Sequence, residues 1–238
     1  MHRFFSSQPL FDTFVLAEGS QFHQILNVFR AKKGEKIVFF ESGGDDIVYE
    51  IVSISKKQIE FTKREVIKKP RKQEVKNNIT VFQALPNKIS TMETIVQKMV
   101  EIGVNHLIFF VAERSQIREM PTGKIMRITS IAQEALEQSG GNKPLIISYW
   151  DKNTENAFLQ FGEEMHHIVG YPGEKNLLQV DEKIGQYALW IWPEWGWSEK
   201  EALFFKQKNC FLWTFNDHIL RLETASIIGA WILSYSLE

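Results

Sequence analysis

Hydrophobic residues in the first 66 positions form short runs that polar residues and glycines separate. Runs of this length that are rich in Val, Ile and Phe are typical of β-strands. The chain contains four of them, at Phe14–Ala17, Lys36–Phe40, Ile47–Ile54 and Gln58–Val66. The sequence Ser-Gly-Gly-Asp-Asp at 42–46 predicts a turn, and Gln21–Phe29 predicts a helix with Ser20 as its N-cap. A small β-barrel fits this pattern.

The hydrophobic rhythm changes after the segment 68–74, which is charged, contains Pro70 and lacks large apolar residues. Such a composition predicts a domain boundary. Beyond it, apolar runs of strand length alternate with segments whose apolar residues recur at helical spacing. The predicted elements are strands at Ile79–Leu85, His106–Val111, Ile168–Gly170, Tyr187–Ile191 and Phe211–Phe215, and helices at Thr91–Ile102, Lys124–Gln138, Ser198–Lys208 and Leu222–Leu237. This alternation predicts an α/β fold with a largely parallel sheet that is covered on both faces.

Polar residues and a glycine mark the ends of these helices. Ser90 with Glu93, and Ser198 with Glu201, have the spacing of a capping box. Gly103 stands where a helix is expected to stop. Together with the boundary, these signals predict two domains, residues 1–72 and 73–238.

The composition is that of an ordinary folded protein, with 238 residues of which 44% are hydrophobic and 24% are charged. No apolar run reaches the roughly 18 residues that a membrane span needs, and the first residues lack the apolar stretch of a secretory signal. Cys210 is the single cysteine, so no internal disulfide can form and a cytoplasmic protein is expected. In its apolar stretch, Cys210 is interpreted as core filler rather than as a nucleophile.

The net charge of −1 conceals an uneven distribution. Residues 1–76 hold 14 Lys and Arg against 10 Asp and Glu, whereas residues 77–238 hold 14 against 19. The segment 56–76 is the most basic, with nine basic and three acidic residues. A basic segment raises the affinity for phosphate without reading sequence. Taken alone, a solvated linker explains it better than a nucleic-acid site.

Several common site motifs are absent from the sequence. It has no G-x-G-x-x-G after the first α/β strand, no G-x-x-x-x-G-K-[ST] phosphate loop and no G-x-S-x-G elbow. The segment Glu163–His167 has the residue types of metal ligands but not the H-E-x-x-H spacing. Its two histidines are adjacent and would point to opposite faces of a strand. No metal is therefore expected.

Seven short fragments along the whole chain form a recognisable series. They are Arg3–Phe5, His23–Glu35, Gln97–Val104, Glu113–Ser115, Glu137–Gly140, Ile191–Ser198 and Ile219–Ala225. In this order they resemble motifs of the ribosomal RNA small subunit methyltransferase E family of the SPOUT superfamily, among them I-G-P-E-G-G-F-S and L-G-x-R-I-L-R-x-E-T-A. Each fragment alone is a weak signal, whereas seven in the same order are a strong one.

The resemblance implies a fold and a mode of assembly. Family members have an N-terminal PUA-like β-barrel, followed by a SPOUT α/β domain with a C-terminal trefoil knot. Knots are rare exceptions among folds, so the hydrophobic pattern by itself does not predict one. Members form homodimers whose active sites lie at the subunit interface, and we therefore expect a homodimer.

The resemblance also implies an activity, the S-adenosyl-L-methionine-dependent methylation of uridine N3 in 16S ribosomal RNA of the small ribosomal subunit. The cofactor would lie between three loops, at Gly170–Pro172, Trp192–Trp197 and about Trp213–Arg221. Glycine suits such loops because their backbone must approach a ligand closely. The implied cofactor-binding residues are Gly170, Trp192, Pro193, Glu194, Gly196, Ile219, Leu220 and Thr224.

Charged residues are implied for catalysis and for RNA binding in this rRNA (uridine-N3-)-methyltransferase. Arg221 is expected to stabilise the deprotonated uracil, and Glu223 is expected to hold Arg221 in place. The simpler interpretation is that both residues only cap the last helix. The resemblance names no general base and no exact target nucleotide. The implied RNA-binding residues are Arg3, His23, Arg30, Lys32, Lys33 and Arg114.

Tryptophans stand where the family has glycines. Trp192 and Trp195 replace the two glycines of I-G-P-E-G-G. Trp213 replaces the glycine of L-G if three residues are inserted before Ile219, and without a gap that glycine is Asn216. An indole at such a position is expected to fill the cofactor space or to distort the loop.

Two explanations of these tryptophans compete. One is a catalytically silent SPOUT protein that still binds RNA. The other is that UGA codons, which some bacteria read as glycine, stand at these positions, and UGG codons at 192 and 195 would exclude it. A methyltransferase that acts on another RNA is a third function compatible with the sequence.

Overall fold

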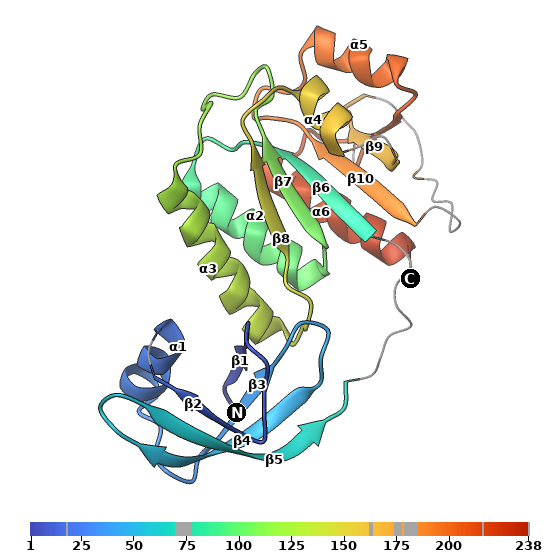
Figure 1. The fold of residues 1–238 in the computed structure, drawn as a ribbon. Helices are drawn as coiled ribbons and strands as arrows, with labels where there is room; N and C mark the ends of the chain where they lie inside the picture. The colour runs from blue at the N-terminus through green and yellow to red at the C-terminus, as the bar shows by residue number, and fades with distance from the viewer. Residues whose placement is uncertain are drawn as a thin grey trace. The chain divides into compact units, whose positions relative to one another are not determined.

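The computed structural model describes most of the chain, namely residues 1–17, 19–69, 78–161, 164–173, 178, 185–215 and 217–237. The chain divides into two compact units (Figure 1). The first comprises Met1–Lys72 with Leu136–Lys143, and the second comprises Gln73–Ala135 with Pro144–Glu238. The predicted domain boundary between residues 72 and 73 lies within 70–77, outside the described residues.

The first unit is built on a five-stranded sheet with the order β1-β3-β4-β5-β2. Its strands are β1 (Arg3–Phe5), β2 (Thr13–Leu16), β3 (Lys36–Phe40), β4 (Asp46–Ile54) and β5 (Ile59–Ile67). β1 pairs with β3 in parallel, and the other pairs are antiparallel. The four predicted strands are confirmed to within one residue, whereas β1 is too short for alternation to predict it. The hydrogen-bonded order ends at β1 and β2, so closure into a barrel stays a prediction.

Aromatic side chains fill the core of this first unit. The Phe14 ring stacks on Phe61 at 4.7 Å between centroids and meets Phe39 and Tyr49 edge-on at 4.9 and 4.8 Å. Such pairs contribute about 0.5–1.5 kcal/mol each beyond their buried area. The Tyr49 hydroxyl donates to the Phe11 carbonyl oxygen at 2.6 Å, and burial raises its pKa to about 12. The tyrosine is therefore a neutral core residue.

The predicted helix at Gln21–Phe29 is present, but its start and its form differ. α1 (Ser20–His23) continues into a π-helical segment, η1 (Gln24–Val28). The N-cap is Gly19 at φ 99°, and no side chain caps the helix, so the prediction of Ser20 as N-cap was wrong. A positive φ favours glycine because it has no Cβ. The chain therefore turns at Gly19, and Ser20 is already helical.

The second unit contains a six-stranded sheet of order β11-β9-β10-β6-β7-β8 in which every pair is parallel. The strands are β6 (Asn78–Ala84), β7 (His106–Phe110), β8 (Ile146–Trp150), β9 (His166–Gly170), β10 (Gln186–Ile191) and β11 (Phe211–Trp213). The helices are α2 (Ile89–Ile102), α3 (Thr122–Ser139), α4 (Thr154–Phe161), α5 (Glu199–Gln207) and α6 (Leu222–Ser236). Every predicted element is confirmed to within two residues. Two elements were missed: the edge strand β8, whose side chains are half-exposed, and α4, which has only eight residues.

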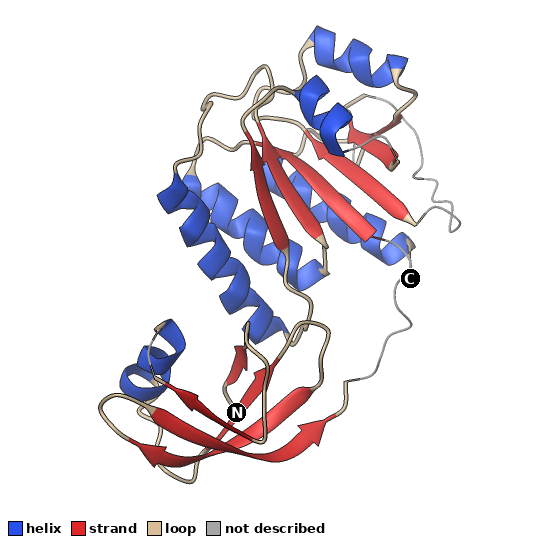
Figure 2. Cartoon of the chain, in the orientation of Figure 1, coloured by secondary structure: helices blue, strands red, loops and turns tan. Residues whose placement is uncertain are grey.

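Helices cover both faces of this sheet, as its pattern predicts (Figure 2). On one face, Trp190 of β10 stacks on Phe82 of β6 at 3.9 Å and contacts Phe158 of α4 and Phe205 of α5. Leu189, the preceding residue, points to the opposite face, where α6 packs against α2. None of the helices within the described ranges has the length and apolar character that a membrane span needs.

Two of the three helix-end signals predicted for the second unit are confirmed. The Ser198 hydroxyl accepts a hydrogen bond from the Glu201 N–H, and the Glu201 carboxylate accepts one from the Ser198 N–H, which completes the capping box. Gly103 ends α2 at φ 89°. The capping box predicted at Ser90 was wrong, because Lys88 is the N-cap and Ser90 already lies in the first turn.

Candidate functional site

Three loops leave one edge of the parallel sheet at neighbouring positions. β9 ends at Gly170, β10 at Ile191 and β11 at Trp213, and these strands are adjacent in the order β11-β9-β10. Because they are parallel, their carboxyl ends lie at the same edge. In open α/β sheets, ligands bind outside the carboxyl ends of the strands. The fold thus brings the three predicted cofactor loops together.

Hydrogen bonds connect these loops to one another. The Trp197 indole Nε1 donates to the Gly170 carbonyl oxygen at 2.8 Å. The Tyr171 N–H donates to the Trp213 carbonyl oxygen at 2.9 Å, and the Thr214 hydroxyl donates to the Tyr171 carbonyl oxygen at 2.7 Å. These hydrogen bonds join the end of β9 and its loop to the loops after β10 and β11, and so hold the three loops together.

A small, open depression lies between the three loops. It has room for about one water molecule, about 10 Å³. The lining residues are Pro172, Trp192, Thr214, Phe215, His218, Ile219 and Leu220. The rings of Trp192 and Phe215 stack with their centroids 5.6 Å apart. Three predicted cofactor-binding residues, Trp192, Ile219 and Leu220, thus line one site.

Gly170 lies directly against these two rings. A Cβ atom added at Gly170 would stand 2.5 Å from Trp192 Cζ3 and 2.9 Å from Phe215 Cζ. Real Cβ atoms do not approach other atoms so closely, so a side chain at position 170 would displace a ring. Trp192 is only 6% exposed. An indole therefore fills the space over Gly170.

The other two tryptophans at family glycine positions behave differently. Trp195 is 67% exposed and does not line the depression. Trp213 is buried at the end of β11, with its ring 4.4 Å from that of Phe215. None of the three tryptophans has a positive φ. The backbone conformation therefore requires glycine at none of these positions.

Besides Gly170, four predicted cofactor-binding residues are not among those that line the depression. Gly196, at φ 70°, closes a turn by donating its N–H to the carbonyl oxygen of the buried Pro193 at 2.9 Å. Glu194 accepts a hydrogen bond from the Asn87 backbone N–H at 2.8 Å. Thr224 is half-buried in the first turn of α6. Gly196, Pro193 and Glu194 therefore shape the loop after β10 and do not form the wall of the depression.

Arg221 and Glu223 stand at the start of α6. Arg221 is the exposed N-cap residue and directly follows Leu220 of the depression. In the described part of the chain, no ion pair or hydrogen bond joins the Arg221 and Glu223 side chains, so the predicted holding contact is not formed. Glu223 lies in the first turn, where a negative charge interacts favourably with the helix dipole. The simpler interpretation as helix-end residues thus describes Glu223, while the Arg221 side chain caps nothing.

Sequence reasoning missed a buried carboxylate next to the loop after β10. Glu201 accepts hydrogen bonds from the Glu113 N–H at 3.0 Å and from the Thr154 hydroxyl, in addition to its capping bond with Ser198. The Ser198 hydroxyl donates to the Glu113 carboxylate at 2.6 Å. The Ser198–Glu201 spacing was the available signal, but it predicts only the cap and not the two distant partners.

Most of the predicted RNA-binding residues are exposed. In the first unit, the exposed ones are His23, Arg30, Lys32 and Lys33. In the second unit, the exposed Arg114 donates from Nη1 to the Trp195 carbonyl oxygen at 3.2 Å. A guanidinium has five N–H donors, so this bond leaves donors for a phosphate.

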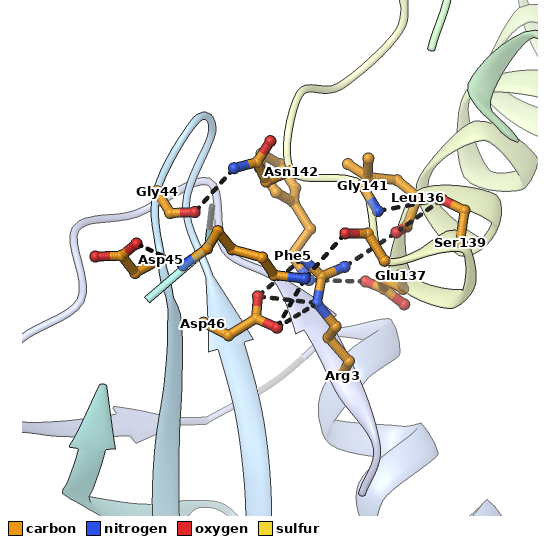
Figure 3. Close-up of polar contacts among 12 residues, drawn as sticks. Arg3, Phe5, Gly44, Asp45, Asp46, Leu136, Glu137, Ser139, Gly141 and Asn142 are labelled. Atoms are coloured by element: carbon orange, nitrogen blue, oxygen red, sulfur yellow. Dashed lines mark hydrogen bonds and ion pairs between the residues drawn. The ribbon is translucent and has the colours of Figure 1, made fainter. Parts of the chain in front are cut away.

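Arg3 differs from these residues because its contacts lie inside the first unit (Figure 3). Its guanidinium pairs with Asp46 at 2.9 Å, lies 3.4 Å from the ring centroid of Phe40 and donates to the Leu136 carbonyl oxygen at 3.1 Å. The Arg3 side chain is only 11% exposed. Removing one partner of such a buried pair leaves an uncompensated charge. We therefore replace the prediction that Arg3 binds RNA with a structural role.

Two further candidates for chemistry are also engaged in packing. Burial raises the pKa of the half-buried Cys210 thiol to about 12, so it is not a thiolate at neutral pH. His167 accepts a hydrogen bond from the Trp190 indole at 2.9 Å, and its ring stacks on Phe158 at 4.2 Å. Glu163 lies outside the described residues, and no group of three possible metal ligands occurs among those described.

Comparison with known families gives the class of the protein first. The family model of the RNA methyltransferase domain matches residues 73–234. This range contains all three loops and the depression. The class defined by the fold and the site is therefore that of the RNA methyltransferase domain.

Curated relatives then give the family. The ribosomal RNA small subunit methyltransferase E 2 of Borreliella burgdorferi is 30% identical over 219 residues, which cover 90% of this chain and 87% of that protein. The ribosomal RNA small subunit methyltransferase E of Bacillus subtilis is 26% identical over 233 residues, covering 92% and 89%. The chain belongs to the ribosomal RNA small subunit methyltransferase E family.

Solved structures share the fold along the whole chain. The ribosomal RNA small subunit methyltransferase E of Neisseria gonorrhoeae, bound to S-adenosyl methionine, matches with a TM-score of 0.85 at 22% identity, covering 99% of this chain and 98% of that one. A methyltransferase of Legionella pneumophila in complex with the same cofactor matches with a TM-score of 0.84 at 21% identity, covering 98% and 97%. These two structures thus share the fold of this chain.

Proposed function

We propose that this protein is an S-adenosyl-L-methionine-dependent methyltransferase that modifies N3 of a uridine in 16S ribosomal RNA. The observation that carries the proposal is the meeting of three loops at the carboxyl ends of β9, β10 and β11, with a depression between them. Family membership and the cofactor found in two structural neighbours support the same ligand class. Because ribosomal RNA is the proposed substrate, we also propose a cytoplasmic location.

The described conformation does not accommodate the whole cofactor. The depression has room for about one water molecule, about 10 Å³, and Trp192 occupies the space over Gly170. Pro172, Thr214 and Leu220 would border a larger site if the Trp192 ring moved away. When bound, the cofactor would supply an electrophilic methyl group.

Arg221 is the residue that we propose for catalysis. Methylation at N3 requires loss of the N3 proton, which leaves negative charge on the uracil ring. A cation placed where such charge develops stabilises the transition state. Arg221 is exposed, follows Leu220 of the depression and has no ion-pair partner among the described residues. We assign no proton acceptor and no role in chemistry to Glu223.

RNA binding is proposed for the exposed basic residues of both units. Arg30, Lys32 and Lys33 follow η1 in one short loop, and Arg114 lies in the loop after β7. Such side chains bind phosphates and position an RNA without reading its sequence. Arg3 is left out of this set because its charge is already paired inside the first unit.

The finer features of fold and assembly are proposals as well. We propose a PUA-like barrel for the first unit and a trefoil knot for the C-terminal segment. The knot is supported by the path of the chain, since β11 lies at the sheet edge while the following α6 packs on the central strands β6 and β10. A homodimer is supported by Trp231 and Tyr235, which stack at 5.6 Å and are exposed on α6.

The filled depression favours a second candidate function, that of a catalytically silent RNA-binding protein. Two experiments separate the candidates. Incubation of the purified protein with small ribosomal subunits and methyl-labelled S-adenosylmethionine is expected to label 16S ribosomal RNA. Primer extension on RNA from a deletion strain is expected to lose a stop at one uridine, because N3 methylation blocks base pairing. If 16S ribosomal RNA takes up no label and the deletion strain loses no stop, the catalytically silent protein is favoured. If another RNA is labelled, that RNA replaces 16S ribosomal RNA as the proposed substrate.

A further inference from the structure

Three tryptophans near the end of β10 differ in how they are held. The Trp190 indole donates to His167 Nδ1 at 2.9 Å, and the Trp197 indole donates to the Gly170 carbonyl oxygen at 2.8 Å. Trp192 lies between them in sequence, and its indole makes no hydrogen bond to any described residue. Stacking on Phe215 and contact with Gly170 hold it instead. Trp192 is therefore the one of these three whose ring can leave its place without breaking a hydrogen bond to the described chain.

The space that the Trp192 ring occupies is part of the candidate site itself. The ring lines the depression together with residues of the loops after β9 and β11. Its Cζ3 atom lies where a Cβ of Gly170 would be only 2.5 Å away, so the ring rests directly on the backbone at the end of β9. Phe215 closes the other side, where it also contacts Gly229 of α6.

We propose that Trp192 is a gate residue that sets the affinity of this protein for its methyl donor. The proposal rests on the proposed function, because it takes S-adenosylmethionine as the ligand of the depression. With the ring over Gly170 the site is closed, and with the ring displaced the site is open. When only a fraction of molecules is open, the apparent dissociation constant rises by the inverse of that fraction. Removing the ring leaves the site open in every molecule, so the apparent dissociation constant is no longer raised.

The test is isothermal titration calorimetry of the 238-residue chain with S-adenosylmethionine. Trp192→Gly is expected to bind the cofactor at least about tenfold more tightly than the unmodified protein. Trp195→Gly is the matched control, because it makes the same change in the same loop at an exposed residue that does not line the depression. The control is expected to stay within about twofold of the unmodified protein.

A second pair of variants tests the geometry if Trp192→Gly folds poorly. Trp192→Ala keeps a Cβ atom, and Phe215→Leu shortens the partner ring while leaving Trp192 in place. Both are expected to tighten binding, by a smaller factor than Trp192→Gly. The thermal melting of Gly170→Ala gives a readout without ligand. Its loss of stability is expected in the unmodified background and is expected to shrink when combined with Trp192→Ala, because the alanine Cβ then meets no indole.

The possible outcomes separate the gate from the proposed function. If the unmodified protein binds the cofactor and the folded Trp192 variants bind it no more tightly, the gate is wrong and the proposed function stands. If no variant binds at millimolar cofactor, both fail. If only the Trp192 variants bind, the gate is supported and the natural protein is silent because its gate stays closed.

Discussion

Trp190 in β10 and Trp192, which follows the last residue of β10, are held in different ways. Trp190 is fully buried, stacks on Phe82 and is bonded to His167. Trp192 lies just beyond the end of β10, stacks on Phe215 and packs over Gly170. The same side chain is thus a fixed part of the core at one position and a removable part of the site at the other. The two positions differ because Phe82, Phe158 and Phe205 pack around the Trp190 ring, whereas the Trp192 ring lines the depression.

The largest expected effect concerns the fixed indole. Trp190→Ala should lower the free energy of unfolding by about 3–5 kcal/mol, since it opens a cavity in a fully buried aromatic stack. Trp192→Ala should cost at least about 1 kcal/mol less, because its ring borders an open depression. Denaturant unfolding measures both. If both variants lost the same free energy of unfolding, the distinction between a core indole and a site indole would be wrong. The control Trp195→Ala changes an exposed ring and should stay within about 0.5 kcal/mol of the unmodified protein.

The next prediction concerns Arg221, whose substitution should change the methylation rate without changing the stability of the core. Arg221→Ala should lower the methylation rate about 100-fold to 1,000-fold, as expected when one group that stabilises developing charge is lost. Its unfolding free energy and cofactor affinity should not change, because the side chain is exposed. Single-turnover labelling of small subunits measures the rate, with Arg127→Ala on α3 as an exposed control. A rate that stays within threefold, on the order of 0.6 kcal/mol, would remove Arg221 from the mechanism.

Substitutions of lysines in the loop after η1 should weaken RNA binding more than substitutions of exposed lysines elsewhere. Lys32→Ala combined with Lys33→Ala should weaken binding to 16S ribosomal RNA and lower the slope of log affinity against log salt by about one per lost phosphate contact. The matched control is Lys56→Ala with Lys57→Ala, an exposed pair in the turn between β4 and β5. Filter binding at several salt concentrations measures the slope. Equal slopes for the two double variants would show that the basic loop holds no special role.

The smallest effect is at Cys210. Its raised pKa of about 12 in the folded state lies above the ordinary thiol value of about 8.5. The folded thiol therefore keeps its proton where the unfolded thiol loses it, so this group's contribution to stability is complete below about pH 8.5 and falls as the pH rises toward 12. At pH 8 a thiol reagent should label folded protein at least about tenfold more slowly than urea-unfolded protein. Equal rates would contradict burial of this thiol.

Local signals in the sequence predict the elements of this fold well. The strands from Lys36 to Ile54 and the helix end at Gly103 follow from side-chain types within a few residues of each position. Ser90 shows the limit of such signals, because α2 begins at Ile89 with Lys88 as its N-cap, and Ser90 lies in the first turn. Edge strand β8 also escapes prediction, and its side chains are half-exposed.

The candidate site is predicted only in part, because its character depends on residues far apart in the chain. Family motifs bring the three loops to attention, and the parallel order of β9, β10 and β11 then follows from the fold. No local pattern indicates that Trp192 stacks on Phe215 over Gly170, because the three residues lie on three separate loops. Likewise Arg3 looks like a free basic residue until the fold places Asp46 and Phe40 against it.

Glu201 has a consequence for how this chain can evolve. One buried carboxylate accepts from the Thr154 hydroxyl, from the Ser198 N–H and from the Glu113 N–H, in three segments that are distant in sequence. A mutation that removes this acceptor leaves several donors without a partner in the interior. Homologues that lose Glu201 should therefore also lose Thr154, so that the two positions change together in evolution.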